Sequence, residues 1–495
     1  MSCAVSAVLC LSSGSAPEFL GRSTVALPHR GGTLRVTLSE GRQLPGAPMT
    51  LTPRQENLLK HTFLDYYQTS EFLEHPLILN RADGLYYWDV EGKRYFDAIG
   101  GIFVATLGHH HPRLLDAVRR QLDQITFAPP LHGIAEVTLD FVEKIGTVTP
   151  GNLKYVKAFS GGSEAVEAAL KFVRQYFKQT GHPGKYKFVS RYFGYHGGTF
   201  GGMAASGTGP RKTKFEPQMA GFVKVFPPSY YRDRFATWEE ANRFAAESFE
   251  DVIIAEDPET VAGVIVEPVG NTGGIITPTP EYFQIIRRAC DRHNVILIFD
   301  EVITGFAKTG SMFAAQTFGV TPDIICTGKG ISNGVIPLGA MIAREDMAGA
   351  FFGAPGDGVQ FAHGHTFAGN PLACALGIAV VNEMVEHRLA EKAVRLGNHL
   401  ASRLECLKKY GVVREVRGKG VLRGVELVKD TRSMEPFPEL GNALKRTALA
   451  NGLILRIDPT WFAVCPALTA DESAIDEMCD LVEKSLADAL AVVRH

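Results

Sequence analysis

The chain has 495 residues, of which 45% are hydrophobic and 21% are charged, and its formal net charge is -2. A chain of this length exceeds what one hydrophobic core usually supports, so we expect two or more domains in a soluble globular protein. The near-neutral charge offers no electrostatic footprint for nucleic acid, and no uninterrupted apolar stretch of about 20 residues is present to cross a membrane.

The first 48 residues differ from the rest, because they are rich in Ser, Gly and Pro and show little periodicity. Three interpretations stay open for them: an organelle-targeting peptide, a secretory signal or an unstructured extension. Arginines outnumber acids there, but there is no clear basic amphipathic face. No basic residue precedes the apolar segment 4–11, as a secretory signal would require. We therefore predict a disordered extension over residues 1–48.

The eight cysteines are scattered, with no C-x-x-C pair and none of the density of a disulfide scaffold. Each is most simply a small buried hydrophobic side chain in a reducing compartment. We therefore predict a cytoplasmic protein, with mitochondrial targeting by the first 48 residues left open.

Two elements are predicted before residue 98. Apolar residues recur at helical spacing from residue 53 to residue 73, which indicates one amphipathic helix. Two aromatic segments, residues 85–88 and 94–97, are joined by a turn-rich connection, which predicts a hairpin.

A histidine triplet, His109 to His111, lies between Gly108 and Pro112. Consecutive side chains point in different directions, and no second cluster of ligands is evident. We predict a turn at the triplet and no metal site.

Past residue 112 helical segments alternate with short apolar runs. Continuous β-branched runs, separated by helices such as that predicted over residues 280–294, are typical of parallel strands covered on both faces. The sequence therefore predicts an α/β domain whose strands include residues 186–189, 261–266, 295–299 and 323–326. Ligands collect at the carboxyl ends of such strands, so chemistry is expected at Tyr195, Glu267, Asp300 and Lys329.

After residue 377 the pattern changes to two longer helices, residues 377–394 and 397–410, and then to strand-like segments. The segments are residues 412–416, 422–428 and 453–457. This predicts a smaller α+β domain. The predicted boundaries are an extension over 1–48, the N-terminal part of the small domain over 49–111, the large domain over 112–376 and the C-terminal part of the small domain over 377–495.

Lys329 lies between Gly328 and Gly330, just after an apolar run. Glycines remove bulk around the amine, so the carbonyl group of another molecule can approach it closely. A partly desolvated ammonium has a lowered pKa and can act as a Schiff-base nucleophile and general base. The alternative for this residue taken alone is an ordinary surface charge.

Asp300 ends the apolar strand over residues 295–299. A carboxylate at the rim of a buried strand needs a cation or a hydrogen-bond donor, and a protonated ring nitrogen would serve. A helix cap is the alternative.

The segment 160–163, Ser-Gly-Gly-Ser, follows a short apolar run and precedes a strong helix former. A turn of this kind presents free backbone N–H groups and the positive end of a helix dipole, which together favour a phosphate. It is neither a G-x-G-x-x-G nor a Walker sequence.

Two further segments carry side chains that could bind a ligand. Tyr195 precedes Gly197 and Gly198 and could lay its ring over a flat heterocycle. The segment 364–371 offers the hydroxyl of Thr366 and backbone donors before a helix. Each segment has a plain turn as its alternative.

Together these segments require a ligand with an electrophilic carbonyl, a basic ring nitrogen, a phosphate and an aromatic face. Pyridoxal 5′-phosphate has all four groups. The chain resembles the class III (ω-amino) aminotransferases of the type I pyridoxal-phosphate fold, with matching segments in order from about Ala82 to the C-terminus. The most specific match runs from residues 299–302 through residues 329–340.

The resemblance implies a large α/β domain with a mostly parallel seven-stranded sheet covered by helices, plus a smaller α+β domain built from both chain ends. It implies that Lys329 forms the internal aldimine with the cofactor and that Asp300 pairs with the pyridinium nitrogen. Gly162 and Ser163 would hold the phosphate.

The resemblance also assigns residues around the cofactor ring. Tyr195 would stack on one face, Val302 would pack on the other, and Glu267 would lie near the ring oxygen. Thr366 would reach the phosphate bound in the neighbouring subunit. A homodimer with shared active sites is therefore implied, and a higher oligomer is left open.

The implied reaction is transamination, because the cofactor acts as an electron sink. An amino donor displaces Lys329, and the freed amine moves a proton from the donor carbon to the cofactor. Hydrolysis leaves pyridoxamine phosphate and a carbonyl product, and an oxo-acid acceptor then runs the sequence backward.

Departures from the family pattern bear on the substrate. Many members carry an arginine for an α-carboxylate where this chain has Ala463, and the arginine after the aspartate motif is Lys308 here. Arg456 resembles the mobile arginine of amine:pyruvate transaminases, and a planar guanidinium suits bidentate work on a carboxylate. A surface strand arginine is the alternative. We predict an ω-amino acid or amine donor with pyruvate or glyoxylate as acceptor.

Other functions stay open. A decarboxylase, racemase or aminomutase shares this lysine and aspartate, and an aminotransferase that depends on 2-oxoglutarate is a further alternative. A nucleotide-binding oxidoreductase could use residues 160–163 for a pyrophosphate, but it lacks the glycine fingerprint and gives Lys329 no role. A catalytically silent binding protein is disfavoured because the cofactor-contacting positions keep working chemistry.

Overall fold

The computed structural model describes residues 24–29, 32–37 and 49–494, and the chain divides into two compact units, residues 1–77 and 78–495. The first unit contains an antiparallel pair, β1 (Thr24–His29) and β2 (Gly32–Thr37), and two short helices, α1 (Pro53–Leu59) and α2 (Thr69–Glu74). The extension predicted over residues 1–48 lies outside the described residues except for this pair of strands.

The single helix predicted over residues 53–73 is wrong. The hydroxyl of Thr52 accepts the backbone N–H of Gln55 at 3.2 Å and caps α1, but this helix ends at Leu59 and buries no residue. Tyr66 takes a positive φ of 57° before α2 begins. A helix gains most of its stability by packing a face, and α1 has no buried face that would extend it.

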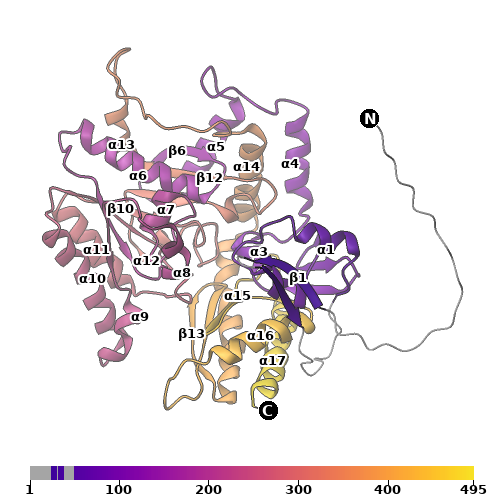
Figure 1. Ribbon diagram of the computed structural model, residues 1–495. Coiled ribbons are helices and arrows are strands. Elements are labelled where there is room, and N and C mark those ends of the chain that lie inside the picture. Colours follow the sequence, from indigo (N-terminus) through magenta and orange to yellow (C-terminus); the bar gives the residue numbers. More distant parts are fainter. Residues whose placement is uncertain (1–23, 30–31, 38–48, 495) are drawn as a thin grey trace, which may run out of the picture. The chain divides into compact units, whose positions relative to one another are not determined.

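The second unit contains a seven-stranded sheet in the order β6-β12-β11-β10-β9-β7-β8 (Figure 1). Its neighbouring strands are parallel except that β12 runs antiparallel to both β6 and β11. The strands are β6 (Leu153–Phe159), β7 (Lys187–Arg191), β8 (Phe222–Val225), β9 (Val261–Val266), β10 (Ile296–Asp300), β11 (Ile324–Thr327) and β12 (Gly339–Arg344). All four predicted strands of the α/β domain belong to this sheet, so that prediction is confirmed.

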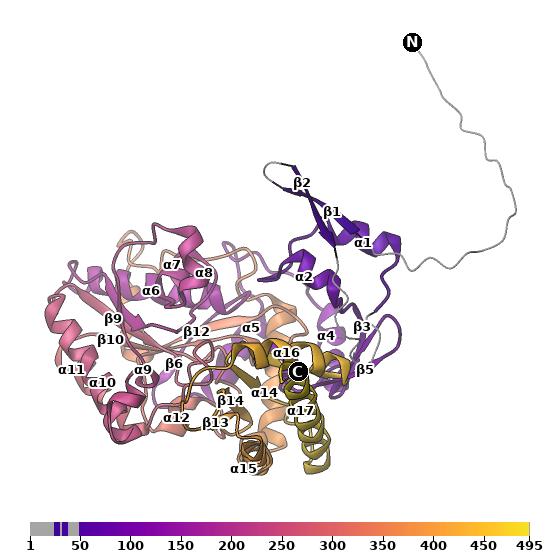
Figure 2. The ribbon, with the colours of Figure 1, turned by 60° about the horizontal axis from the view of Figure 1, so that its bottom comes forward.

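Helices cover both faces of the sheet because alternate strand residues point to opposite sides. In β10, Ile296 and Ile298 belong to the apolar cluster formed with α6 (Gly162–Gln179), whereas Phe299 packs on the other side against Phe283 of α11 (Pro280–Arg292), with ring centres 5.3 Å apart. Helix α10 (Trp238–Ala255) lies beside α11 in both views (Figures 1 and 2).

The remaining helices of this part are short or connect strands. They are α3 (Gly100–Phe103), α4 (Pro112–Leu122), α5 (Glu136–Gly146), α7 (Phe200–Ala205), α8 (Gly209–Lys212), α9 (Pro228–Tyr231), α12 (Ala314–Phe318) and α13 (Glu345–Ala348). None of the helices in the described part of the chain is long and apolar enough to cross a membrane.

Two four-stranded sheets complete the second unit. The first, β15-β5-β4-β3, contains the predicted hairpin and adds β15 parallel to β5, so both ends of the chain contribute to it. The second is β13-β14-β17-β16. Their strands are β3 (Leu79–Asp83), β4 (Tyr86–Asp89), β5 (Arg94–Asp97), β13 (Val413–Lys419), β14 (Leu422–Leu427), β15 (Leu453–Ile454), β16 (Arg456–Asp458) and β17 (Trp461–Val464). The strand predicted over residues 453–457 is divided at Leu455 between the two sheets.

The C-terminal helices are α14 (Pro371–Glu386), α15 (Leu389–Glu405), α16 (Pro438–Ala450) and α17 (Glu472–Val493), and α17 packs against both α15 and α16 (Figure 2). The predicted break between residues 394 and 397 is wrong. The chain turns instead at His387 and Arg388, where Arg388 takes a positive φ of 50°. Helix α14 therefore runs through residue 377, and the division into domains stays a prediction.

Candidate functional site

Five strands bring their carboxyl ends to one edge of the large sheet. Strands β7, β9, β10 and β11 are parallel, and β6 runs in the same direction because β12 is antiparallel to both β6 and β11. The segments that follow these strands hold the predicted site residues Ser163, Tyr195, Glu267, Asp300 and Lys329. These five residues therefore lie at the edge of the sheet where ligands of α/β proteins bind.

Asp300, at the end of β10, is 5% exposed, and its two carboxylate oxygens have separate partners. One oxygen accepts the backbone N–H of Val302 at 3.1 Å, and the other lies 2.8 Å from Nδ1 of His196. His196 is itself buried, and its Nε2 is a buried polar atom without a hydrogen-bond partner. The backbone N–H of Val302 and the imidazole of His196 therefore hold both oxygens of this buried carboxylate in place.

Three backbone segments meet tightly beside this carboxylate. A Cβ atom on Gly162 would lie 2.8 Å from a methyl carbon of Val302, and one on Gly328 would lie 3.2 Å from the backbone nitrogen of Gly162. The close approach of these segments requires glycine at both positions. It holds Lys329 next to the first turn of α6 and next to Val302.

The Lys329 side chain follows β11 and begins a 3-10 turn, Lys329–Ile331. Its backbone takes φ of 48°, a left-handed conformation that is uncommon outside glycine. Burial lowers the pKa of the amine, while the negative charges of Asp300 and Glu267 act in the opposite direction. The predicted desolvation of this amine is therefore present, and both predicted carboxylates lie within electrostatic reach of it.

The free backbone N–H groups at the start of α6 are suited to bind an anion. Gly161 is the N-cap residue, and no side chain caps the first N–H groups of the helix. The Ser163 hydroxyl accepts the N–H of Gly198 at 3.1 Å, so the glycine segment after Tyr195 lies against this turn. The buried hydroxyl of Thr327 also lacks a hydrogen-bond partner. These unmet donors and the space kept free of Cβ atoms fit a phosphorylated ring compound.

Glu267, after β9, is 5% exposed and accepts two backbone donors, the N–H of Tyr195 at 3.0 Å and the N–H of Asn271 at 3.2 Å. Burial raises the pKa of its carboxyl group above the usual range, and the positive field of His196 opposes that shift. Ala463 stands where the resemblance to class III aminotransferases would place an arginine facing this glutamate. Backbone N–H groups hold the side chain here.

Arg456 and Ala463 are direct partners across the antiparallel strands β16 and β17. Opposite residues of such a pair lie on the same face of the sheet. The side chains of Arg456 and Ala463 therefore project from the same face. The Arg456 guanidinium lies over the Trp461 ring, 5.2 Å from its centre, and one of its nitrogens donates to the carbonyl oxygen of Ile457 at 2.9 Å. The residue is half-buried rather than a free surface arginine.

Thr366 lies apart from these residues. It is exposed in the segment before α14, next to Phe367, which is 60% exposed. The described residues give Thr366 no hydrogen bond to the other predicted site residues. A role toward the phosphate of a neighbouring subunit stays a prediction.

Lys308 occupies the position of the arginine that follows the family's aspartate motif. It is 1% exposed, donates to the carbonyl oxygen of Gly305 at 3.1 Å and lies under Gly330, where a Cβ atom would be 2.5 Å from its amine. Burial, chiefly, lowers its pKa to about 8.

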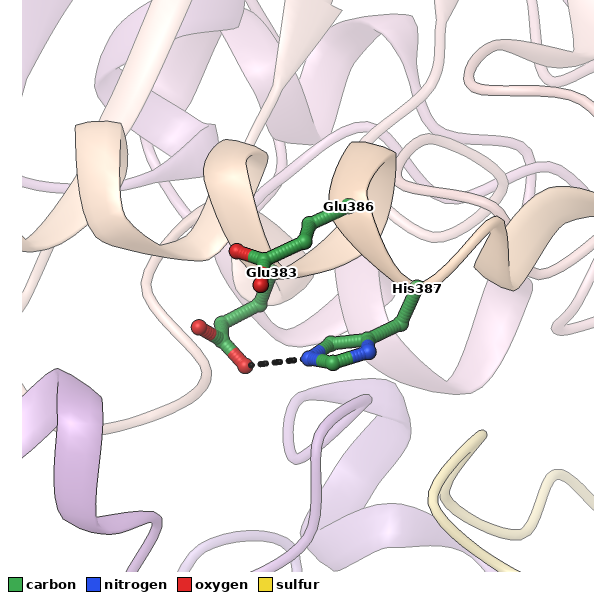
Figure 3. A group of neighbouring side chains, drawn as sticks. All are labelled: Glu383, Glu386 and His387. Atoms are coloured by element: carbon green, nitrogen blue, oxygen red, sulfur yellow. Dashed lines mark ion pairs between the residues drawn. The ribbon is translucent and has the colours of Figure 1, made fainter.

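The histidine triplet makes no common site. His109 Nε2 lies 2.7 Å from the Asp97 carboxylate, whereas His111 Nε2 lies 3.5 Å from Glu383. Figure 3 shows Glu383 beside Glu386 and His387 at the end of α14, with His387 Nε2 3.4 Å from Glu383.

Arg113 already neutralises both glutamates of that cluster. Its Nε lies 2.6 Å from Glu383, and another of its nitrogens lies 2.8 Å from Glu386. We interpret the cluster as an ion-pair network between α4 and α14.

Two residues of the site were not predicted from the sequence. His196 stands inside the segment that singled out Tyr195, but nothing in that segment indicates which strand end its imidazole would meet. Thr327 is adjacent to Gly328, and only the pairing of β11 buries its hydroxyl. Both depend on contacts between strand ends that are distant in the sequence.

Comparison with known proteins places this arrangement in a family. The profile of the family described as "Aminotransferase class-III" matches residues 67–486. A probable aminotransferase of Mycobacterium tuberculosis is 35% identical over 92% of this chain and 98% of its own length. An omega-aminotransferase of Caulobacter vibrioides is 30% identical over 87% of this chain and 98% of its own length.

Solved structures of transaminases also resemble this chain. An (S)-enantioselective omega-transaminase from Thermomicrobium roseum superposes with a TM-score of 0.83 at 33% identity, covering 88% of this chain and 97% of that chain. An amine transaminase from an uncultivated Pseudomonas species, in its form with bound pyridoxal phosphate, gives a TM-score of 0.80 at 30% identity and covers 91% of this chain and 99% of that chain.

Proposed function

This chain belongs to the class III aminotransferase family, and we propose that it moves an amino group from an ω-amino acid or amine donor to an oxo acid such as pyruvate or glyoxylate. The observation that carries the proposal is the meeting of Lys329, Asp300 and the first turn of α6 at one edge of the large sheet. The similarity to a putrescine–pyruvate aminotransferase of Pseudomonas aeruginosa, 31% identical over 87% of this chain, supports the choice of acceptor.

Pyridoxal 5′-phosphate is the cofactor of this enzyme class, and the residues present fit it. The uncapped turn at Gly162 and Ser163 would hold the phosphate, and the buried, unpartnered Thr327 hydroxyl offers one more donor nearby. Tyr195 and Val302 would contact the ring, and Glu267 would lie near its ring oxygen. When bound, the cofactor supplies an electron sink for carbon–hydrogen bond cleavage next to nitrogen.

Lys329 would hold the cofactor through its amine and would be the base that moves the proton. Its amine is desolvated, so a larger neutral fraction is present near neutral pH than for a surface lysine. Gly328 lets this part of the chain approach Gly162 in the first turn of α6. A neutral amine in this place could take a proton from the donor carbon in one half-reaction. In the other half-reaction it could deliver a proton to the acceptor carbon.

Asp300 would face the cofactor's ring nitrogen, where a carboxylate favours a positive partner. His196 and the N–H of Val302 hold the two oxygens of Asp300 in place. His196 therefore acts as a positioning residue in the proposed mechanism.

The active assembly in this proposal is a homodimer. Next to Thr366, Phe367 is 60% exposed, and the centre of the Phe127 ring, itself 42% exposed, lies 6.3 Å from that of Phe367. Two exposed aromatic rings that contact each other favour burial against a partner. A second copy of the chain would cover them and would receive Thr366 at its own phosphate site.

The substrate part of the proposal depends on Arg456 and Ala463. With a methyl group at position 463, the α-carboxylate arginine common in the family is missing, and Arg456 is the half-buried guanidinium on that face of the sheet. A single swinging arginine can bind the acid of an oxo acid in one half-reaction and leave room for an apolar amine in the other. Pyruvate and glyoxylate fit such a site better than a five-carbon diacid.

A donor and acceptor screen of the purified, cofactor-loaded enzyme tests the proposal. We expect turnover of ω-amino acids or amines with pyruvate or glyoxylate, with the acceptor recovered as its amino acid. Turnover with 2-oxoglutarate alone would contradict the proposed acceptor. Release of carbon dioxide, or racemisation without loss of the amino group, would indicate a different reaction on the same framework.

A cytoplasmic location completes the proposal. The cysteines in the described part of the chain are free thiols, and five of the six are buried. Fractionation of the native host's cells tests the location, and recovery of the enzyme in an organelle fraction would contradict it.

A further inference from the structure

Segment 359–366, which we call the strap, lies along one face of helix α6. The side-chain amide of Gln175 donates to the carbonyl oxygen of Gln360 at 2.8 Å and accepts the N–H of Ala362 at 3.0 Å. Gln179, one helical turn away, donates to a further backbone carbonyl oxygen of the strap at 3.1 Å. Two amide side chains of the helix therefore hold the first half of the strap through its backbone.

Two histidines hold the second half of the strap. His363 Nδ1 lies 2.8 Å from the amine of Lys171, one turn before Gln175. An ammonium group only donates, so Nδ1 accepts and the ring proton of His363 lies on Nε2. This Nε2 lies 3.2 Å from Nε2 of His365, which must accept in turn. The hydrogen bond between the two rings therefore requires both imidazoles to be uncharged.

The strap ends beside the turn that is proposed to hold the phosphate. His365 Nδ1 lies 3.9 Å from one carboxylate oxygen of Glu164, and the other oxygen accepts the backbone N–H of Ser160 at 2.7 Å. The ring of Phe159, the last residue of β6, contacts both imidazoles, with centres 5.7 and 5.4 Å away. Thr366 follows His365 directly in the sequence. The contacts of the two histidines therefore limit where the Thr366 hydroxyl can lie.

We propose that His363 and His365 are positioning residues that present Thr366 to the phosphate of the cofactor bound in the neighbouring subunit. The inference deepens the proposed function and rests on the role given there to Thr366. The strap forms no helix or strand, so its side-chain and backbone contacts with α6 are what restrict its motion. A hydroxyl that is ordered before the ligand arrives lowers the entropy cost of binding. The two histidines thus raise cofactor affinity without touching the cofactor.

The histidine pair makes this positioning sensitive to acid. Burial, first, and neighbouring positive charges lower the pKa of His363 to about 4 from the ordinary 6.5. The charged or titratable groups that face it are Lys171, His365, Lys157 and the opposing carboxylate of Glu167. A strap released from α6 takes up a proton near pH 6.5, whereas the bound strap resists it. Attachment of the strap therefore weakens as the pH falls from 6.5 towards 4.

Equilibrium dialysis of pyridoxal 5′-phosphate at pH 7.5 tests the positioning. Thr366→Val and His363→Phe should each raise the dissociation constant of the cofactor by about three- to tenfold, since each removes hydrogen bonds. The double variant should lose no more affinity than Thr366→Val alone, because His363 acts through Thr366. His182→Phe, just past the C-terminal end of α6, is the matched control and should leave the affinity unchanged. Additive losses in the double variant would overturn the proposal.

The pH dependence gives a second readout. Between pH 7.5 and pH 5.5, cofactor affinity should fall about threefold more in wild type than in His363→Phe. The expected factor is modest because water screens the half-buried ring. An equal fall in both proteins would show that the charge state of His363 does not control the strap, and the proposal would be wrong.

Hydrogen exchange separates this inference from the proposed function. Backbone N–H groups of the strap should exchange faster in cofactor-loaded His363→Phe than in loaded wild type, and equal rates would refute the inference. If Thr366→Val leaves cofactor affinity unchanged, the role given to Thr366 in the proposed function fails, and the inference fails with it. If Thr366→Val weakens binding and His363→Phe does not, the inference alone fails. None of these measurements uses turnover, so a different reaction with the same cofactor would leave them unchanged.

Discussion

The carboxyl edge of the seven-stranded sheet and the face of the β13-β14-β17-β16 sheet differ in how they hold charge. At the edge, Asp300 and Glu267 are short, buried side chains held by backbone N–H groups. On the small sheet, Arg456 is a long, half-buried side chain on a strand of three residues. In the proposed function, the strand ends carry the reaction, and the longer arginine side chain on the small sheet contributes to the choice of substrate.

The largest effect that distinguishes the two regions is expected at Lys329. Lys329→Ala removes the attachment point and the proton carrier, so turnover should fall by roughly 10⁴-fold or more with every donor. Borohydride reduction of wild type followed by peptide mapping should place the cofactor on residue 329, and the variant should carry none there. Appreciable transamination by the variant would refute the central assignment.

The next effect is expected at Asp300. Asp300→Asn keeps the shape and the contact with Val302 but removes the charge facing the ring nitrogen, so kcat should fall about 10²–10³-fold. The loss should be equal for acid-bearing and plain amine donors, because this residue belongs to the sheet edge. Steady-state kinetics with both donor types measures it, and a fall of less than threefold would show that the carboxylate is structural.

A smaller effect is expected from the glycine contact under the cofactor. Gly162→Ala would bring a Cβ atom to 2.8 Å from Val302, so cofactor affinity should fall by about 1–3 kcal/mol. Gly161→Ala is the matched control, because a Cβ atom there would meet nothing within 4 Å. Equilibrium dialysis of the cofactor measures both. Adding Val302→Ala to Gly162→Ala should recover part of the loss, and no recovery would mean that the contact is not the cause.

On the small sheet, Arg456→Gln should weaken the binding of substrates that carry a carboxylate. We expect KM for pyruvate and for acid-bearing donors to rise about tenfold or more, with little change in kcat, because a charged hydrogen bond is lost in both bound states. Initial rates over a range of acceptor concentrations measure it. A large fall in kcat with unchanged KM would move Arg456 from substrate binding into the chemical step.

The smallest effect concerns stability and the buried Lys308, which lies beneath the chain next to Lys329. Its pKa is lowered to about 8 from the ordinary 10.5, so between those pH values the unfolded chain binds more protons than the folded chain. The free energy of unfolding therefore rises with pH in that window. Lys308→Met should be more stable than wild type at pH 7.5 by about 1–2 kcal/mol, and the gap should shrink by pH 10.

Urea unfolding of both proteins at the two pH values measures the effect of Lys308. A gap that stays constant from pH 7.5 to pH 10 would show that the amine is paired rather than merely desolvated.

Much of the sheet edge was predictable because its signals are local. A β-branched run followed by Asp300 or by Gly328 and Lys329 indicates a buried strand and its carboxyl end without knowledge of any neighbour. The role of Glu301, the residue after Asp300, could not be predicted from the sequence. Glu301 is fully buried, and its carboxylate accepts the N–H groups of Ala314 and Ala315 at 2.6 and 2.8 Å, so it caps α12. Its partners lie 13 and 14 residues ahead, and no short pattern marks them.

The missed features depend on register between distant strands. The pairing of Arg456 with Ala463, and the contact of His196 with Asp300, require a specific alignment of segments that the sequence shows only as separate apolar runs. The predicted single helix over residues 53–73 failed for a related reason. Helical spacing was visible there, but whether a face is buried depends on what packs against it.

The division of residues 453–458 between two sheets has a consequence for the order in which the chain is made. Strand β5 ends at Asp97, but its parallel neighbour β15 begins at Leu453. A growing chain must therefore leave one edge of that sheet without its partner strand until almost the whole protein has left the ribosome, an interval on the order of tens of seconds at roughly 5–20 residues per second. An unpaired edge is a surface on which nascent chains aggregate. Protection of this edge during synthesis is therefore a requirement that the stability of the finished fold does not meet.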